Sequence, residues 1–144
     1  MTSLLAAGLK VRFRARGHSM GPSVRDGEPV TVAPLDARGV TVGDIVLCET
    51  GRSPLAHRVQ SIGRGATGIA QLVLRGDASL EDDRPVTAGQ VRGHLVTVER
   101  AGRALTLVAP GGAIGKRLLV AALRARASLA AVRARLVVAA LPLR

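Results

Sequence analysis

A serine, a histidine and several carboxylates stand in separate blocks of this sequence, and together they could form a hydrolytic site. Ser19 lies in the segment RGHSMGP (16–22), whose glycines and proline predict a tight, exposed turn. His57 follows in LAHRV (55–59), and acidic residues come later in RGDASLEDD (75–83). A serine hydroxyl becomes an effective nucleophile when a base removes its proton, and a carboxylate can orient that base. The three blocks therefore predict nucleophilic catalysis by Ser19.

The base in this chain is expected to be an imidazole. Lys10 precedes Ser19 and Lys116 lies near the C-terminus, so no lysine occupies the region between the serine and the acidic block. An unperturbed imidazole has a pKa of about 6.5 and is largely neutral at pH 7, which suits His57 for this task. Spacing alone does not decide which carboxylate orients the imidazole, and three remain open: Asp77, Asp82 and Asp83.

These blocks, in this order, resemble the S24/S26 serine peptidase superfamily, which comprises type I signal peptidases and LexA-like self-cleaving proteins. The His-Arg-Val segment at 57–59 is similar to the archaeal, endoplasmic-reticulum and sporulation-type signal peptidases, which have histidine in place of lysine. The resemblance implies that Asp83 orients His57 and that Asp77 is a structural or secondary carboxylate. It also implies a serine endopeptidase that cuts a leader, signal or precursor peptide without a cofactor.

The resemblance extends to the surroundings of the nucleophile. The backbone N–H of Ser19 is expected to donate to the oxyanion, within a turn formed with Gly17 and Met20. Signal peptidases often have a hydroxyl residue where this chain has Gly17, whereas LexA-like proteins have glycine there. Met20 and Pro22 are expected to line the substrate cleft. His18 is expected beside the site and not as its base, because adjacent side chains diverge.

The segments that must position these groups have the sequence pattern of β-strands. Short apolar runs separated by glycine, proline and aspartate predict a mainly β, barrel-like sheet domain over residues 1–110, in the manner of LexA and the signal peptidases. A hairpin turn is expected at 100–103 and a hairpin tip at 63–68. The runs that we expect to be strands are centred on 30–33, 45–48, 72–74, 95–98 and 105–108.

The character of the sequence changes after Pro110-Gly111-Gly112. Apolar residues recur four and three apart from Leu118 to Leu143, with basic residues off that stripe. This pattern predicts a basic amphipathic helix over 113–141, within a C-terminal segment of 111–144. We expect the helix to pack on the β domain or on a second copy of the chain; the alternative is peripheral contact with an anionic membrane surface.

Composition restricts the remaining function classes. The chain has 144 residues, which suits a single domain, and a net charge of +11, which invites a nucleic-acid or membrane partner. Phe13 is the only aromatic residue, so nothing can stack on bases and a nucleic-acid partner is not favoured. No uncharged apolar window of about 18 residues exists, so we expect no transmembrane segment and a cytoplasmic or peripherally membrane-associated protein.

Other chemistry-bearing residues have simpler interpretations. Cys48 lies in an apolar run and is expected in the core; the alternative is a cysteine nucleophile paired with His57. His18, His57 and His94 share no ligand spacing, so no metal site is expected. Two further functions stay open: a non-catalytic module that binds a peptide or partner, and a basic binder of membrane surfaces or nucleic acid. The oligomeric state is not predicted.

Overall fold

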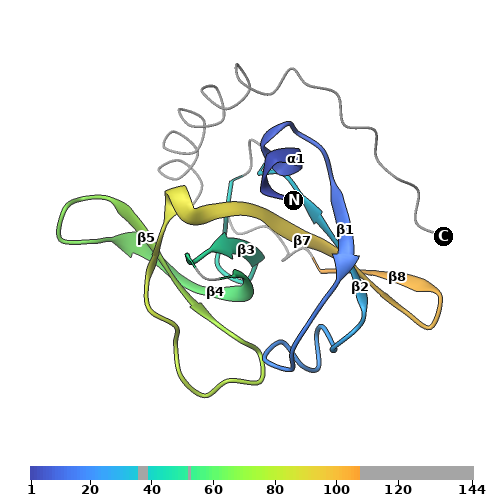
Figure 1. Cartoon of the computed structure of the whole chain (residues 1–144). Helices are drawn as coiled ribbons and strands as arrows, with labels where there is room; N and C mark the ends of the chain where they lie inside the picture. The colour runs from blue at the N-terminus through green and yellow to red at the C-terminus, as the bar shows by residue number, and fades with distance from the viewer. Residues whose placement is uncertain (36–38, 52, 108–144) are drawn as a thin grey trace.

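The computed structural model describes residues 1–35, 39–51 and 53–107. Within these residues the chain is mainly β: one antiparallel sheet curls into a half barrel, with little helix (Figure 1). The predicted β class is thereby confirmed. The predicted helix over 113–141 and the C-terminal segment 111–144 lie outside the described residues.

The strands follow one another with short connections, and most neighbours in the sheet are also neighbours in the sequence. The sheet order is β1-β2-β7-β3-β4-β5-β6, and β8 pairs with β7. The exceptions are the pairings of β7 with β2 and with β3, which close the middle of the sheet over long sequence separations. The elements are α1 Thr2–Ala6, β1 Val11–Arg14, β2 Pro29–Ala33, β3 Ile45–Glu49, β4 Pro54–Arg64, β5 Ala70–Arg75, β6 Val86–Thr87, the 3₁₀ turn η1 Ala88–Gln90, β7 Val91–Arg100 and β8 Arg103–Thr106.

The central strand β3 is buried on both of its faces. Val46 and Cys48 belong to one apolar cluster with Leu72 and Leu74 of β5, whereas Ile45 and Leu47 belong to a second cluster. Successive side chains of a strand point to opposite faces, so a run of four apolar residues serves both clusters. The second cluster also contains Leu5 of α1, and Met20 and Val24 from the segment after β1.

Two local features differ from the prediction, and one agrees with it. Helix α1 was not predicted, because five residues carry too short a pattern to distinguish a helix from a loop. Strand β4 continues through Arg64, so the hairpin tip is shorter than 63–68. The β7–β8 hairpin occurs where predicted: Ala101 and Gly102 both have positive φ (50° and 72°), as a two-residue turn of this hand requires.

The sequence predicts no transmembrane segment, and for helices this prediction can be compared with the structure. Among the residues that the structure describes, no helix combines the length and the apolar character needed to cross a membrane.

Candidate active site

Ser19 lies in an exposed turn between β1 and β2 that is anchored on both sides. At its start, Gly17 has a φ of +94° and donates its N–H to Asp26 Oδ1 at 2.7 Å. After it, Val24 donates its N–H to the carbonyl of Met20 at 3.0 Å, and the side chains of both residues are buried in the second apolar cluster. Glycine adopts a left-handed backbone at little cost, which explains the residue at 17. The turn therefore presents the Ser19 hydroxyl on a fixed backbone.

His57 lies in β4, next to Val46 of β3 in the sheet register, and its side chain is nearly buried. Its Nε2 atom is 2.9 Å from Ser19 Oγ. Its Nδ1 atom is 2.5 Å from Asp83 Oδ2. When Nδ1–H donates to the carboxylate, Nε2 carries the lone pair that accepts the serine O–H. The three side chains thus form one continuous chain of hydrogen bonds from 19 to 57 to 83.

The loop after β5 brings Asp83 to this position. It leaves β5 at Arg75, passes Ser19 and returns to β5. Ala78 donates its N–H to the Ser19 carbonyl at 2.9 Å, and Asp83 donates its N–H to the Leu74 carbonyl at 2.8 Å. Backbone bonds therefore tie the loop both to the nucleophile turn and to the end of the strand beside β4.

Gly76 begins this loop at the closest approach of backbone to the site. A Cβ atom at this position would lie 2.5 Å from the carbonyl oxygen of Ser19 and 3.1 Å from Nε2 of His57. It would also lie 3.0 Å from Ser79 Oγ. Glycine is therefore required here by space. The sequence marked Gly76 as part of a motif, but this packing role was not predicted.

Asp77 has a different partner from Asp83. Arg58 donates to both of its carboxylate oxygens, at 2.7 and 2.6 Å. The same guanidinium donates to the carbonyl of Gly43 at 2.7 Å and to Ser23 Oγ at 3.2 Å. Arg58 thus joins β4, the loop before β3, the nucleophile turn and the loop after β5.

The charge state of Asp77 follows from these contacts. Burial alone would raise its pKa, but the hydrogen bonds from Arg58 and Ser23 outweigh burial and hold the pKa below its usual value. In turn, the hydrogen bond to Asp77 raises the pKa of Arg58. Asp77 is a structural carboxylate in this arrangement. Of the three carboxylates that spacing left open, the third, Asp82, approaches Arg75 Nη1 at 3.6 Å.

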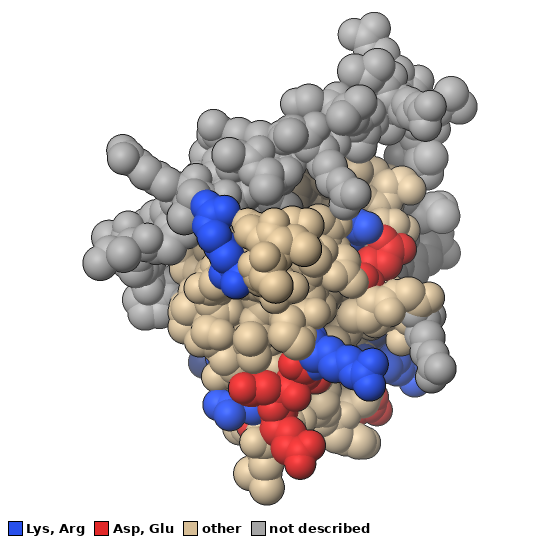
Figure 2. All heavy atoms as spheres, turned by 90° about the vertical axis from the view of Figure 1, so that its left-hand side faces the viewer, with Lys and Arg blue, Asp and Glu red and all other residues tan. Residues whose placement is uncertain are grey.

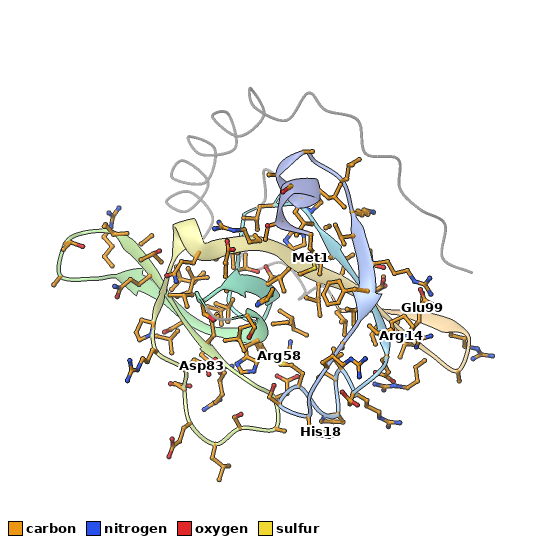
Figure 3. The ribbon with its side chains drawn as sticks, viewed as in Figure 1. Met1, Arg14, His18, Arg58, Asp83 and Glu99 are labelled. Atoms are coloured by element: carbon orange, nitrogen blue, oxygen red, sulfur yellow. The ribbon has the colours of Figure 1, made fainter. Side chains whose placement is uncertain are left out.

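The positions of three residues near Ser19 can be compared with the sequence predictions: Met20, Pro22 and His18. Met20 is only 6% exposed and packs in the core, so it anchors the turn and does not line an open cleft as predicted. Pro22 is exposed, and its carbonyl accepts a bond from Arg100 at 3.1 Å. His18 is exposed on the turn between β1 and β2, whereas Arg58 lies within β4 and Asp83 in the loop after β5 (Figure 3).

Arg100 was also missed by the sequence interpretation. Its Nη2 atom donates to the carbonyls of Pro22 and Ser23, at 3.1 and 3.3 Å. It also forms a two-point bond with Glu28, through Nε at 2.5 Å and Nη2 at 2.9 Å. Because Arg100 lies at the end of β7, this contact depends on the pairing of β7 with β2, which no local pattern indicates.

The structure places the other candidate groups away from reactive roles. Cys48 is fully buried, and burial raises the pKa of its thiol to about 12, so the thiolate needed by a cysteine nucleophile is disfavoured. His94 is buried in β7. Among the described residues, no group of three or more His, Cys, Asp or Glu side chains could hold a metal ion.

The described basic side chains do not form a single patch on the face seen in Figure 2. On the described part of this face, basic side chains lie next to acidic ones. Two-point pairs between Arg12 and Glu99 and between Arg92 and Glu49 show the same local neutralisation elsewhere.

The arrangement can perform one kind of chemistry well: attack by a serine hydroxyl, with an imidazole as base and a carboxylate that holds the imidazole. No protein-family model matches this chain, and a search of curated proteins found no match.

Proposed function

We propose that this chain is a serine endopeptidase with a LexA- or signal-peptidase-like fold, which cuts a leader, signal or precursor peptide. The observation that carries the proposal is the continuous chain of hydrogen bonds from Ser19 Oγ to His57 and on to Asp83, at 2.9 and 2.5 Å. An exposed serine on a surface turn seldom meets a nearly buried imidazole that is itself held by a carboxylate. This combination recurs in serine hydrolases on unrelated folds.

In the first half of the reaction, His57 accepts the Ser19 proton through Nε2 as Oγ attacks the peptide carbonyl. The C–O bond to serine forms and the carbonyl electrons move to oxygen, to which we expect the backbone N–H of Ser19 to donate. Asp83 stabilises the imidazolium that results. When the intermediate collapses, the C–N bond breaks and His57 gives its proton to the leaving amine.

In the second half, water replaces the leaving peptide. His57 removes a proton from the water, which attacks the acyl group on Ser19. The ester bond breaks, and the serine recovers its proton from the imidazolium. The same three side chains serve both halves, so the mechanism needs no metal or cofactor.

A peptide substrate is favoured over a small ester for two reasons. The blocks around Ser19, His57 and Asp83 resemble those of peptidases that act on exposed, extended segments. In addition, Ser19 is exposed on the turn that follows strand β1, so an extended chain can approach it.

The experiment is cleavage of a proteome-derived peptide mixture by the wild-type chain and by variants, with new termini identified by mass spectrometry. Ser19→Ala and His57→Ala should each abolish cleavage and leave the unfolding temperature unchanged. Ser61→Ala, at an exposed serine of β4, is the matched control and should cleave as the wild type does. Wild-type cleavage by both of the first two variants would refute the proposal.

A further inference from the structure

A shallow depression lies next to the Ser19–His57 pair, with a volume of about 400 Å³. It starts at Gly76, where an added Cβ would lie 3.1 Å from Nε2 of His57. Side chains of β4, of β5 and of the loop after β5 form its wall. Four of the side chains are hydrogen-bond donors, Arg58, Gln60, Arg75 and Ser79, and the carboxylate of Asp77, which Arg58 holds through two hydrogen bonds, also lines the depression.

The two arginines that line the depression differ in how many of their N–H groups are already hydrogen-bonded. Arg58 donates to Asp77 twice and to two further oxygens, so its charge is matched by a carboxylate at hydrogen-bond distance. Arg75 donates to Gln60 Oε1 at 3.0 Å, and its Nη1 atom approaches Asp82 at 3.6 Å. A guanidinium has five N–H donors, so Arg75 can still bind a carboxylate through two parallel bonds.

The approach of Asp82 to Arg75 indicates which ligand suits the depression. The separation of 3.6 Å is longer than a hydrogen bond, and the two side chains are 41% and 49% exposed. A carboxylate is therefore already attracted to this guanidinium but is not bound to it in good geometry. A carboxylate from a substrate could take the same place with shorter bonds.

Two further groups of the loop fit an acidic side chain. Ser79 lines the depression, and its Oγ atom lies 3.0 Å from the Cβ position of Gly76, so a hydroxyl donor stands close to the Ser19–His57 pair. Leu80 is 96% exposed at the same depression and can cover the methylene groups of a glutamate. The wall thus offers a cation, a hydroxyl and an apolar contact.

The position of the depression assigns it to one side of the scissile bond. In the proposed reaction, Nε2 of His57 must reach the leaving amine in order to protonate it. A Cβ on Gly76 would lie 3.1 Å from Nε2, and Gly76 lines the depression together with Arg75. The segment that enters it is therefore the start of the leaving peptide.

We propose that this depression is a subsite for an acidic side chain, carried by one of the first two residues of the leaving peptide, and that Arg75 determines this preference. The inference rests on the proposed peptidase function and adds a substrate class to it. Because Arg75 is partly exposed, its contribution is moderate and weakens as the salt concentration rises.

The test uses the peptide-mixture cleavage of the full chain and, for rates, peptides that differ only in Glu, Gln or Lys at the enriched position. Wild type should favour acidic residues at the first or second leaving position. Arg75→Gln should lower kcat/KM for the Glu peptide by about fivefold and leave the Gln peptide unchanged. Asp82→Asn, which removes the competing carboxylate, should raise kcat/KM for the Glu peptide.

The control is Arg103→Gln, at an exposed arginine of β8, which pairs with β7 and not with β4 or β5. It should leave the preference unchanged. Equal use of the three peptides by the wild type, or a preference that survives in Arg75→Gln, would overturn the subsite and leave the peptidase assignment standing. A complete absence of cleavage would contradict the peptidase function, and the subsite would fall with it.

Discussion

A Cβ atom on Gly76 would lie 2.5 Å from the carbonyl oxygen of Ser19, which no side chain can tolerate without movement. The two residues come from different loops, so this contact sets how closely the loop that holds Asp83 can approach the nucleophile turn. Ala78, two residues further, reinforces the approach with a hydrogen bond of 2.9 Å to the same oxygen. The geometry of the proposed site therefore depends on the absence of one methyl group.

We predict that Gly76→Ala removes most of the proposed peptidase activity by displacing the loop. A shift near 1 Å at a catalytic group can lower the rate by about 10²-fold, and overpacking typically costs about 1–3 kcal/mol of unfolding free energy. Peptide cleavage and chemical denaturation measure the two effects. Gly63→Ala is the control, because a Cβ there meets nothing within 4 Å. Full activity in Gly76→Ala would show that the contact does not set the geometry.

The two neighbouring aspartates of this loop should behave differently. Asp83→Asn keeps the size of the side chain but removes the charge that holds the imidazole, so kcat should fall on the order of 10⁴-fold. Asp82→Asn should retain turnover of neutral peptides, because Asp82 approaches Arg75 and not the imidazole. Steady-state kinetics on one neutral peptide compares them. Equal losses in the two variants would contradict the assignment of Asp83.

The sequence predicted which residues belong to the candidate site better than it predicted how these residues contact one another. Ser19 and His57 could be chosen as partners because their residue types, turn chemistry and order resemble a known arrangement, and the structure places them 2.9 Å apart. Spacing could not separate Asp83 from Asp77, because both lie in one loop and their side chains differ in direction. That difference depends on the backbone bonds that hold the loop on Ser19 and Leu74.

Contacts between strands that are far apart in the sequence could not be predicted, for a related reason. Arg58 was visible in the His-Arg-Val block, but its contact with Asp77 requires the register of β4 on β5, in which Arg58 faces Arg75. Arg100 reaches the nucleophile turn because β7 pairs with β2, and a local pattern carries no information on that pairing. The mainly β class, by contrast, followed from short apolar runs and turn residues, which are local.

Arg58→Lys should test the role of the guanidinium as a support of the site. Lysine keeps the charge but cannot make two parallel bonds to Asp77 and also reach Gly43 and Ser23. We expect a loss of about 2 kcal/mol in unfolding free energy, since hydrogen bonds to a partly buried carboxylate are lost. Chemical denaturation measures it.

The matched control for this change is Arg12→Lys, which alters an exposed two-point pair with Glu99. Exposed pairs contribute little, so its unfolding free energy should fall by less than about 1 kcal/mol. If the two lysine variants lose the same amount, Arg58 has no special structural role.

Glu28 should make part of the stability depend on acid pH. The hydrogen bond from Arg100 is the largest of the effects that lower its pKa, from 4.5 to about 2. A carboxyl group whose folded pKa is depressed adds stability above its unfolded pKa, and that stability is lost as the pH falls through the folded pKa. The wild type should therefore lose more unfolding free energy than Glu28→Gln between about pH 4.5 and about pH 2.

Denaturation at several pH values across that window measures this difference. Arg100→Gln removes the main cause of the lowered pKa, so it should reduce the acid sensitivity in the same way as Glu28→Gln. Equal acid sensitivity in the wild type and both variants would show that the pair adds no such dependence.

The most direct measurement is the rate and position of modification by a fluorophosphonate, followed by mass spectrometry of the intact chain and its peptides. The reagent needs an activated serine and no knowledge of the substrate. If Ser19 is the nucleophile and His57 its base, we expect one adduct, on Ser19. It should form at least about 10³-fold more slowly in His57→Ala and be absent in Ser19→Ala. No adduct in the wild type, an adduct on another serine, or an unchanged rate in His57→Ala would contradict this assignment.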